Sequence, residues 1–313
     1  MTIPVASTPF HGIWPALLTP LKPDLGIDLH RFGLHAHSLV HAKGCGGVVP
    51  FGTTGEGPSF SVAERRDAVD ALVGEGVPAS QILVSNSCAA LPDTLALTRH
   101  ALAIGAHGCL MMPPFFLKGG APQVTDQGVI DSYRQVIDGA ADDRLRLYLY
   151  HIPQVSGIGL SRKVIETLKR LYPQTIAGIK DSSGDTAHTL ALADAFNETL
   201  MVTAGHEPDL PELARRGSTG AVSGLANFMP HVVQRLAGRP DAPNTPHDVS
   251  RVRLLLAMLG SYALTPALKG IMAALSGEPG WLRVRAPLVA LTPDQMHTLQ
   301  HALKPIALDL DVD

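Results

Sequence analysis

The sequence is poor in aromatic residues, in charge and in cysteine, and these shortages exclude several classes of protein. Only 5% of its 313 residues are aromatic and 17% are charged, with a net charge of −3. So balanced a charge gives no overall attraction for nucleic acid or an anionic membrane, and we expect neither as a partner. No apolar run approaches the roughly 18 residues of a membrane-spanning helix. The N-terminus lacks a secretory signal, so we expect a cytoplasmic protein.

The three cysteines, Cys45, Cys88 and Cys109, are odd in number and do not suggest a disulfide framework. Each lies in or beside an apolar run, which favours buried reduced thiols. A reactive cysteine is the functional alternative.

Eight short apolar runs recur along the chain, each followed by turn residues and most then by a segment with helical spacing. Some of these segments begin with helix caps: Ser61 stands three residues before Glu64 as in a capping box, and Ser161 and Asp185 precede two others. The runs, which we interpret as strands, span residues 12–19, 46–51, 82–85, 108–112, 145–150, 176–180, 201–204 and 220–223. The helical segments include residues 64–73, 94–104, 129–141, 162–171, 186–196 and 208–216.

Continuously apolar strands are buried on both faces, as in a parallel sheet, and eight βα units close most economically into a barrel. The sequence therefore predicts an α/β fold, a (β/α)8 TIM barrel, over residues 1–228. Residues 229–313 are expected to form a C-terminal helical extension packed on the barrel, interrupted by the polar, Pro-rich stretch 238–248. A doubly wound open sheet is the alternative, although its glycine-rich fingerprint after the first strand is missing.

Barrel active sites gather at the carboxyl ends of the strands, where Lys180 and Tyr150 stand out. Lys180 ends an apolar strand, where desolvation disfavours a charged amine, and a neutral amine is the nucleophile that forms a Schiff base with a ketone. Alternatively, Lys180 reaches solvent or pairs with Asp181. Tyr150 ends the neighbouring strand, where its phenol can relay protons or be a buried group with a satisfied hydroxyl.

The loop from Gly52 to Glu56, with the sequence GTTGE, follows the second strand. Its glycines permit a tight turn, and consecutive backbone amides with the hydroxyls of Thr53 and Thr54 can surround a carboxylate or phosphate. A plain turn would have the same composition. Glu56 cannot bind an anion, so we expect it to cap backbone amides at the start of the next helix.

Together, GTTGE, the Y-x-[IV]-P segment at Tyr150 and the G-[IV]-K-D-x-[ST]-G-[DN] segment at Lys180 resemble the dihydrodipicolinate synthase and N-acetylneuraminate lyase family. Members of this family are pyruvate-dependent class I aldolases. The resemblance implies a (β/α)8 barrel with a C-terminal helical extension, a homotetramer, and chemistry that uses no metal or organic cofactor.

The resemblance also assigns roles to residues of this chain. It implies that Lys180 forms the Schiff base, that Tyr150 is the acid or base, and that Thr53 passes protons to Tyr150. Thr53 and Thr54, in the loop that begins at Gly52, would hold the pyruvate carboxylate. Ser223 falls in the eighth-strand segment GAVSGLAN, which lines the pocket in the family.

Departures from the family pattern concern the aldehyde half of the substrate. Dihydrodipicolinate synthases carry an arginine for the aldehyde's carboxylate where this chain has Val155, which cannot make that contact. They also carry a second tyrosine where this chain has Phe116. The segment 153–157 is similar to P-x-L-S-G of neuraminate lyases, and Glu207 either binds a substrate hydroxyl or is an ordinary acid at a helix start. His151, where the family usually has Asn, is either structural or a substrate contact.

The sequence thus predicts a Schiff-base-forming carbon–carbon lyase that cleaves or forms a 4-hydroxy-2-oxo acid, similar to neuraminate lyases rather than to enzymes of lysine biosynthesis. The enzymatic alternatives are a 2-oxo sugar acid dehydratase and a 4-hydroxy-tetrahydrodipicolinate synthase. The non-enzymatic alternative is a pyruvate-binding regulator. The expected partners are pyruvate or another small 2-oxo acid and further copies of the chain.

Overall fold

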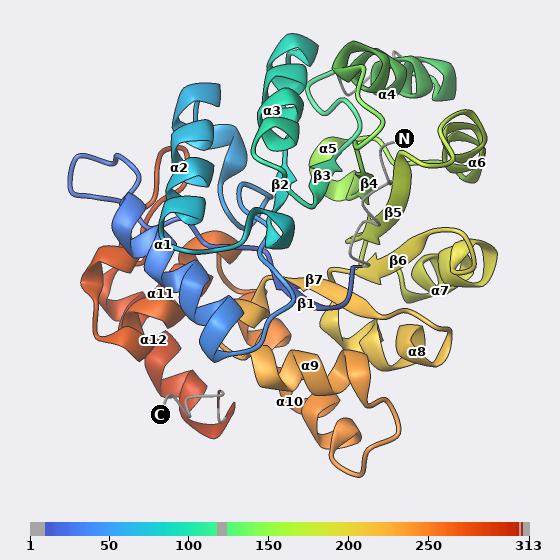
Figure 1. Ribbon diagram of the computed structural model, residues 1–313. Helices are drawn as coiled ribbons and strands as arrows, with labels where there is room; N and C mark the ends of the chain where they lie inside the picture. Colours follow the sequence, from blue (N-terminus) through green and yellow to red (C-terminus); the bar gives the residue numbers. More distant parts are fainter. Residues whose placement is uncertain (1–9, 118–123, 307, 309–313) are drawn as a thin grey trace.

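The computed structural model describes residues 10–117, 124–306 and 308, with the strands inside a layer of helices (Figure 1). The start of the N-terminal segment searched for a signal, and the end of the predicted extension, lie outside these residues. The described strands pair in parallel, β1 with β7 and β2 to β6 in order. They are β1 (Gly12–Pro15), β2 (Leu83–Ser85), β3 (Gly108–Met111), β4 (Leu147–His151), β5 (Ile176–Asp181), β6 (Met201–Ala204) and β7 (Gly220–Ser223).

The second predicted strand, residues 46–51, forms no continuous ladder in the described structure. Val48 makes a parallel bridge to Ile82 and Val49 makes one to Ala16. Pro50, which has no N–H to donate, follows directly. The segment still stands between β1 and β2, and β6 packs against β7, so the ring closes. The (β/α)8 barrel is confirmed, and the open doubly wound sheet is wrong.

Strand residues alternate between the inside of the barrel and the helices, because successive side chains of a strand point to opposite faces. Leu110 and Tyr148 belong to the inner cluster of buried side chains, whereas Cys109 and Leu149 belong to the larger cluster shared with the helices. Tyr150, two residues after Tyr148, is therefore directed inward with the inner cluster.

The predicted helix caps are confirmed. Ser61 and Glu64 form a capping box at the start of α2, and the side chains of Ser161 and Asp185 accept backbone N–H bonds at the starts of α6 and α7. The helices are α1 (Leu29–His37), α2 (Val62–Gly74), α3 (Leu91–Ala103), α4 (Asp126–Ala140), α5 (Pro153–Ser156), α6 (Arg162–Leu171), α7 (Thr186–Phe196), α8 (Leu210–Arg215), α9 (Pro230–Gly238), α10 (Thr245–Leu259), α11 (Leu264–Ser276) and α12 (Pro293–Leu303).

The C-terminal helices pack on the barrel. Helix α9 lies against β1 and β7, and α10 lies against α9. Helix α10 begins at Thr245, inside the stretch predicted to be irregular, because a proline such as Pro246 is compatible with the first turn of a helix. The division at residue 228 stays a prediction. No single helix of the described residues is long and apolar enough to cross a membrane; α10 and α11 meet that test only as a pair bent by 115°.

All three cysteines are free thiols. Burial raises the pKa of Cys45 and of Cys109 to about 12, so both are inert, as the apolar context predicted. Cys88 is half-buried, its sulfur accepts a bond from Arg65 at 3.2 Å, and burial raises its pKa too.

Candidate active site

Lys180, Tyr150 and Thr53 meet at the carboxyl end of the barrel. Tyr150 and Lys180 are paired across β4 and β5, so both side chains point inward. Lys180 Nζ donates to the Tyr150 hydroxyl at 3.4 Å and lies 4.4 Å from the centre of its ring. Thr53 Oγ1 lies 3.4 Å from the same hydroxyl. The three residues predicted as catalytic are therefore brought together, with Lys180 and Tyr150 buried.

The surroundings of Tyr150 favour its ionised form. Burial raises the pKa of the phenol, but the charge of Lys180 and hydrogen bonds with Thr53, Ser182 and Lys180 outweigh burial, so the pKa of Tyr150 is lowered overall. A phenol with a lowered pKa gives and takes a proton more readily near neutral pH.

Two neighbours of Lys180 were not assigned a role from the sequence. Ser182 hydrogen-bonds to the Tyr150 phenol. A Cβ built on Gly205 would collide with Ser182 Oγ and lie 3.1 Å from Lys180 Cε, so the absence of a side chain there leaves room for the lysine stem. Both follow strand ends, and that position is the one signal in the sequence that points to them.

The alternative that pairs Lys180 with Asp181 is wrong. Neighbouring strand residues point to opposite faces, and the Asp181 carboxylate instead bonds on the helix side to His188, Thr189 and the Ser183 N–H.

The expectation that Glu56 caps the following helix is also wrong, because Ser61 and Glu64 cap the start of α2 and Glu56 makes no side-chain cap bond. Glu56 is buried and pairs with Lys269 Nζ of α11. The loop from Gly52 to Glu56 is a closed turn, in which the Gly57 N–H bonds to Gly52 O at 3.2 Å. The carboxylate of Glu56 therefore ties this loop to the C-terminal helices.

The other residues predicted to bind substrate lie on different elements of the barrel. Glu207 and Ser223, beyond β6 and at the end of β7, are joined by a 2.6 Å hydrogen bond from Ser223 Oγ, and burial raises the pKa of Glu207. Thr54 Oγ1 would lie 3.3 Å from a Cβ on Gly224, so Thr54 approaches the end of β7. Val155 lies on α5 after β4, with 39% of its surface exposed.

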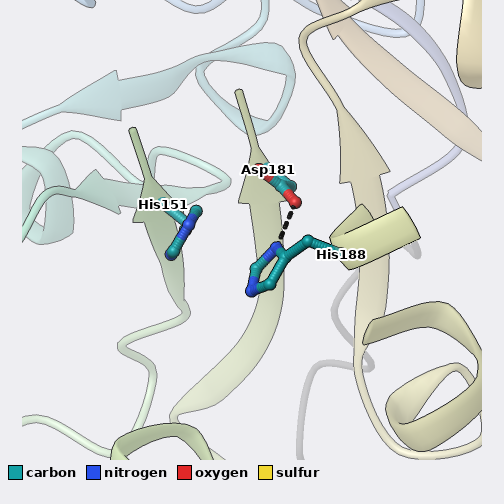
Figure 2. A group of neighbouring side chains, drawn as sticks. All are labelled: His151, Asp181 and His188. Carbon is teal, nitrogen blue, oxygen red and sulfur yellow. Dashed lines mark hydrogen bonds and ion pairs between the residues drawn. The ribbon is translucent and has the colours of Figure 1, made fainter. Parts of the chain in front are cut away.

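On the side of β5 that faces the helices, His151, Asp181 and His188 gather ligand-type atoms within 4.8 Å of one another (Figure 2). His188 Nδ1 bonds to Asp181 Oδ2 at 2.8 Å, and His151 Nδ1 accepts the Leu160 N–H at 3.0 Å. A neutral His151 must then carry its proton on Nε2, which leaves that nitrogen without a lone pair for a metal ion. The cluster therefore fits a hydrogen-bonded support better than a metal site.

The comparisons with known proteins agree with this geometry. The model of the dihydrodipicolinate synthetase family matches residues 9–306. An uncharacterized DapA-like lyase of Chloroflexus aurantiacus is 32% identical over 94% of this chain and 96% of its own length. The 4-hydroxy-tetrahydrodipicolinate synthase of Methanococcoides burtonii is 32% identical over 95% of this chain and 98% of its own length.

A solved structure gives the same result. Dihydrodipicolinate synthase from Agrobacterium tumefaciens superposes with a TM-score of 0.88 at 31% identity, covering 95% of this chain and 100% of that one. The chain therefore belongs to the dihydrodipicolinate synthetase family and is a pyruvate-dependent aldolase or lyase of that family.

Proposed function

We propose that the protein cleaves or forms a 4-hydroxy-2-oxo acid through a Schiff base between Lys180 and the 2-oxo carbon. The observation that carries this proposal is the placement of Lys180 Nζ, buried at the end of β5 and 3.4 Å from the Tyr150 hydroxyl. A buried amine next to a proton-transferring phenol supplies the nucleophile and the acid or base that imine chemistry requires.

In the cleavage direction, the Lys180 amine adds to C2 of the oxo acid. The hydroxyl at C2 then leaves as water with the proton of the Tyr150 phenol, which gives a protonated imine and the Tyr150 phenolate. Tyr150, as the phenolate, takes the proton of the C4 hydroxyl. The C3–C4 bond then breaks, its electrons move into the imine, and the aldehyde departs. Tyr150 then protonates the resulting enamine at C3, and water hydrolyses the protonated imine to release pyruvate and the free amine, with the released proton returning to Tyr150.

The loop with Gly52, Thr53 and Thr54 holds the pyruvate carboxylate in this proposal. The loop begins directly after residues 46–51, the segment between β1 and β2. Thr53 Oγ1 lies 3.4 Å from the Tyr150 hydroxyl, so the loop borders the reacting carbon. Thr53 also passes protons to and from Tyr150. Because hydroxyl and amide donors can hold a carboxylate, no basic surface is needed.

For the aldehyde half, we propose a hydroxylated tail of the kind that neuraminate lyases accept. Val155 offers no charge for a distal carboxylate, whereas Glu207 and Ser223, which are buried and bonded to each other, place polar groups near the ends of β6 and β7. This favours a sugar-acid-like substrate over the substrate of lysine biosynthesis.

The proposal is tested by incubating the protein with pyruvate and sodium borohydride, which reduces an imine to a stable secondary amine. We expect mass spectrometry to locate the adduct on the peptide that contains Lys180. Lys269→Met serves as the control, because Lys269 is also buried but is paired with Glu56. A wild-type protein that forms no adduct on Lys180 contradicts the proposal.

A panel of 4-hydroxy-2-oxo acids, with pyruvate release as the readout, then identifies the aldehyde half. A product that retains all carbons of the substrate would indicate the dehydratase instead. Faster condensation of pyruvate with aspartate semialdehyde than with sugar aldehydes would indicate the 4-hydroxy-tetrahydrodipicolinate synthase. The homotetramer and the cytoplasmic location stay predictions.

A further inference from the structure

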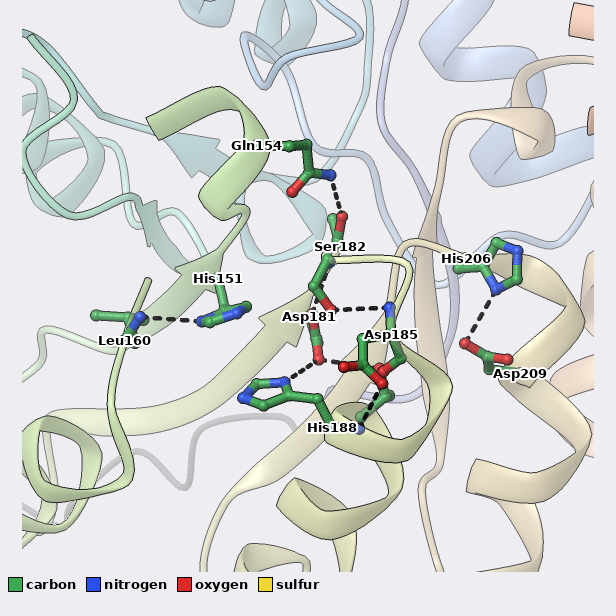
Figure 3. Close-up of polar contacts among 11 residues, drawn as sticks. His151, Gln154, Leu160, Asp181, Ser182, Asp185, His188, His206 and Asp209 are labelled. Atoms are coloured by element: carbon green, nitrogen blue, oxygen red, sulfur yellow. Dashed lines mark hydrogen bonds and ion pairs between the residues drawn. The ribbon is translucent and has the colours of Figure 1, made fainter. Parts of the chain in front are cut away.

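The loop of residues 152–160 follows β4 and is fastened to the catalytic strands at both ends (Figure 3). Near its start, Gln154 Nε2 donates to Ser182 O at 2.5 Å. At its end, the Leu160 N–H donates to His151 Nδ1 at 3.0 Å. Because the loop begins two residues after Tyr150 and contains Val155, it borders the space where the aldehyde half of the substrate lies under the proposed function.

His151 fits this loop in shape as well as in hydrogen bonding. A Cβ on Gly159 would lie 2.9 Å from His151 Cε1, so the loop backbone runs directly over the imidazole. Leu160 is buried at 2% exposure, and a buried N–H without an acceptor is costly. The imidazole nitrogen therefore supplies an acceptor that the loop needs in this conformation.

The His151 imidazole also packs against His188, which hydrogen-bonds to the strand that carries Lys180. The rings of His151 and His188 are stacked, 4.5 Å apart and 24° from parallel. His188, from α7, bonds to Asp181, which lies between Lys180 and Ser182 on β5. The Ser182 N–H in turn donates to His151 O at 2.8 Å. His151 thus links the loop to the end of the strand that carries Lys180.

We propose that His151 is a positioning residue that holds loop 152–160, through its unprotonated Nδ1, in the conformation that recognises the aldehyde half of the substrate. This role rests on the proposed function, because it assigns the loop to substrate recognition. His151 affects binding of the aldehyde half of the substrate. It does not affect imine formation with pyruvate, because Lys180 and Tyr150 lie on the opposite face of β4 and β5.

The role has a pH dependence with a definite sign. Protonation of His151 places a hydrogen on Nδ1, which then faces the Leu160 N–H as a second donor, and the bond is lost. The titratable groups that face His151 are Asp181 from β5 and His188 from α7, and burial is the main cause of its lowered pKa. The loop is therefore held above the usual pKa of histidine, and it is released as the pH falls through the lowered pKa of His151.

The test compares His151→Leu, which removes the acceptor, with His151→Asn, which places an amide oxygen near the position of Nδ1. At neutral pH we expect His151→Leu to raise KM for the cleaved 2-oxo acid about tenfold. The kcat and the rate of borohydride trapping with pyruvate alone should stay within about twofold of wild type. Hydrogen exchange of the peptide covering residues 152–160 should be faster.

His151→Asn should restore KM at neutral pH and should also remove the rise in KM that we expect for the wild-type protein in acid. An unchanged KM in His151→Leu, or a His151→Asn variant that does not restore it, overturns the proposal. A parallel fall in pyruvate trapping overturns it too, because the residue would then act through Lys180 or the fold. If wild type forms no pyruvate adduct, the proposed function fails, and hydrogen exchange alone still decides whether His151 holds the loop.

Discussion

Among the residues that the structure describes, two lysines are buried, and their surroundings differ. Lys180 is 6% exposed and Lys269 is 0% exposed. Lys269, on α11, pairs with the Glu56 carboxylate and donates to Arg283 O at 2.7 Å. Lys180 instead donates to the Tyr150 hydroxyl and lies over its ring. Burial is common to both lysines, and their partners differ.

Under the proposed function, this difference indicates that hydrogen-bonding partners, more than burial, distinguish the lysine that forms the imine from the lysine that supports the fold. Burial lowers the pKa of Lys269, but the Glu56 carboxylate opposes this effect by favouring the ammonium ion. The amine of Lys269 is thus occupied by a carboxylate and a carbonyl. That of Lys180 faces a phenol that can exchange protons with a substrate, which is the arrangement imine formation needs.

The largest expected effect comes from Lys180→Arg, which keeps a positive charge but removes the nucleophile. We expect kcat/KM to fall roughly 10⁴-fold or more, and the borohydride adduct to disappear, while Lys269→Met keeps the adduct on Lys180. Steady-state kinetics and peptide mass analysis measure both effects. An adduct on Lys269 in the Lys180→Arg variant would erase the distinction between the two lysines.

Tyr150→Phe keeps the ring that lies against Lys180 and removes only the hydroxyl. We expect kcat to fall roughly 10²- to 10⁴-fold, as for the loss of a general acid or base. The thermal midpoint should change little, because the buried ring stays. A fall in kcat of less than tenfold would argue against proton transfer by Tyr150.

Lys269→Met tests the structural lysine. It leaves the Glu56 carboxylate buried without its partner, which we expect to lower the free energy of unfolding by about 3 kcal/mol. The double variant Glu56→Gln/Lys269→Met, which buries no charge, should recover most of that loss. Urea denaturation measures all three proteins. Equal stabilities of the single and double variants would show that the pair is not coupled.

The smallest effect is expected at the partly exposed ion pair between Glu64 of α2 and Arg285 of the C-terminal region. The Arg285 guanidinium lowers the pKa of Glu64 to about 2, but the Glu64 side chain is 36% exposed, so solvent screens the pair. Glu64→Gln, which retains a capping side chain, should cost less than about 1 kcal/mol at neutral pH.

The effect of Glu64→Gln on stability should depend on pH, and the direction of that dependence follows from the lowered pKa of Glu64. Because the pKa of Glu64 is lowered on folding, its contribution is full above the ordinary value of 4.5 and is lost as the pH falls toward about 2. The difference in urea midpoint between wild type and Glu64→Gln should therefore shrink from pH 7 to pH 3. A difference that does not depend on pH would show that the charge of Glu64 is not the cause.

The sequence predicted which candidate side chains meet where the signal was local. Lys180 and Tyr150 each end an apolar run, and the ends of parallel strands converge at one mouth, so their meeting followed from the fold. The partner of Glu56 and the absence of a continuous ladder at residues 46–51 were not predicted. Glu56 finds its partner on α11, far along the chain, and residues 46–51 pair only through single bridges.

The sequence by itself determined the order of strands and helices, the helix caps and the family, because apolar periodicity, capping residues and short motifs act over a few residues. Only the tertiary structure decided which buried lysine meets a carboxylate, that Gly205 makes room for Lys180, and that His151 accepts a bond from the loop behind it. These contacts join residues on different elements, and their geometry depends on how the closed barrel sets each side chain against its neighbours.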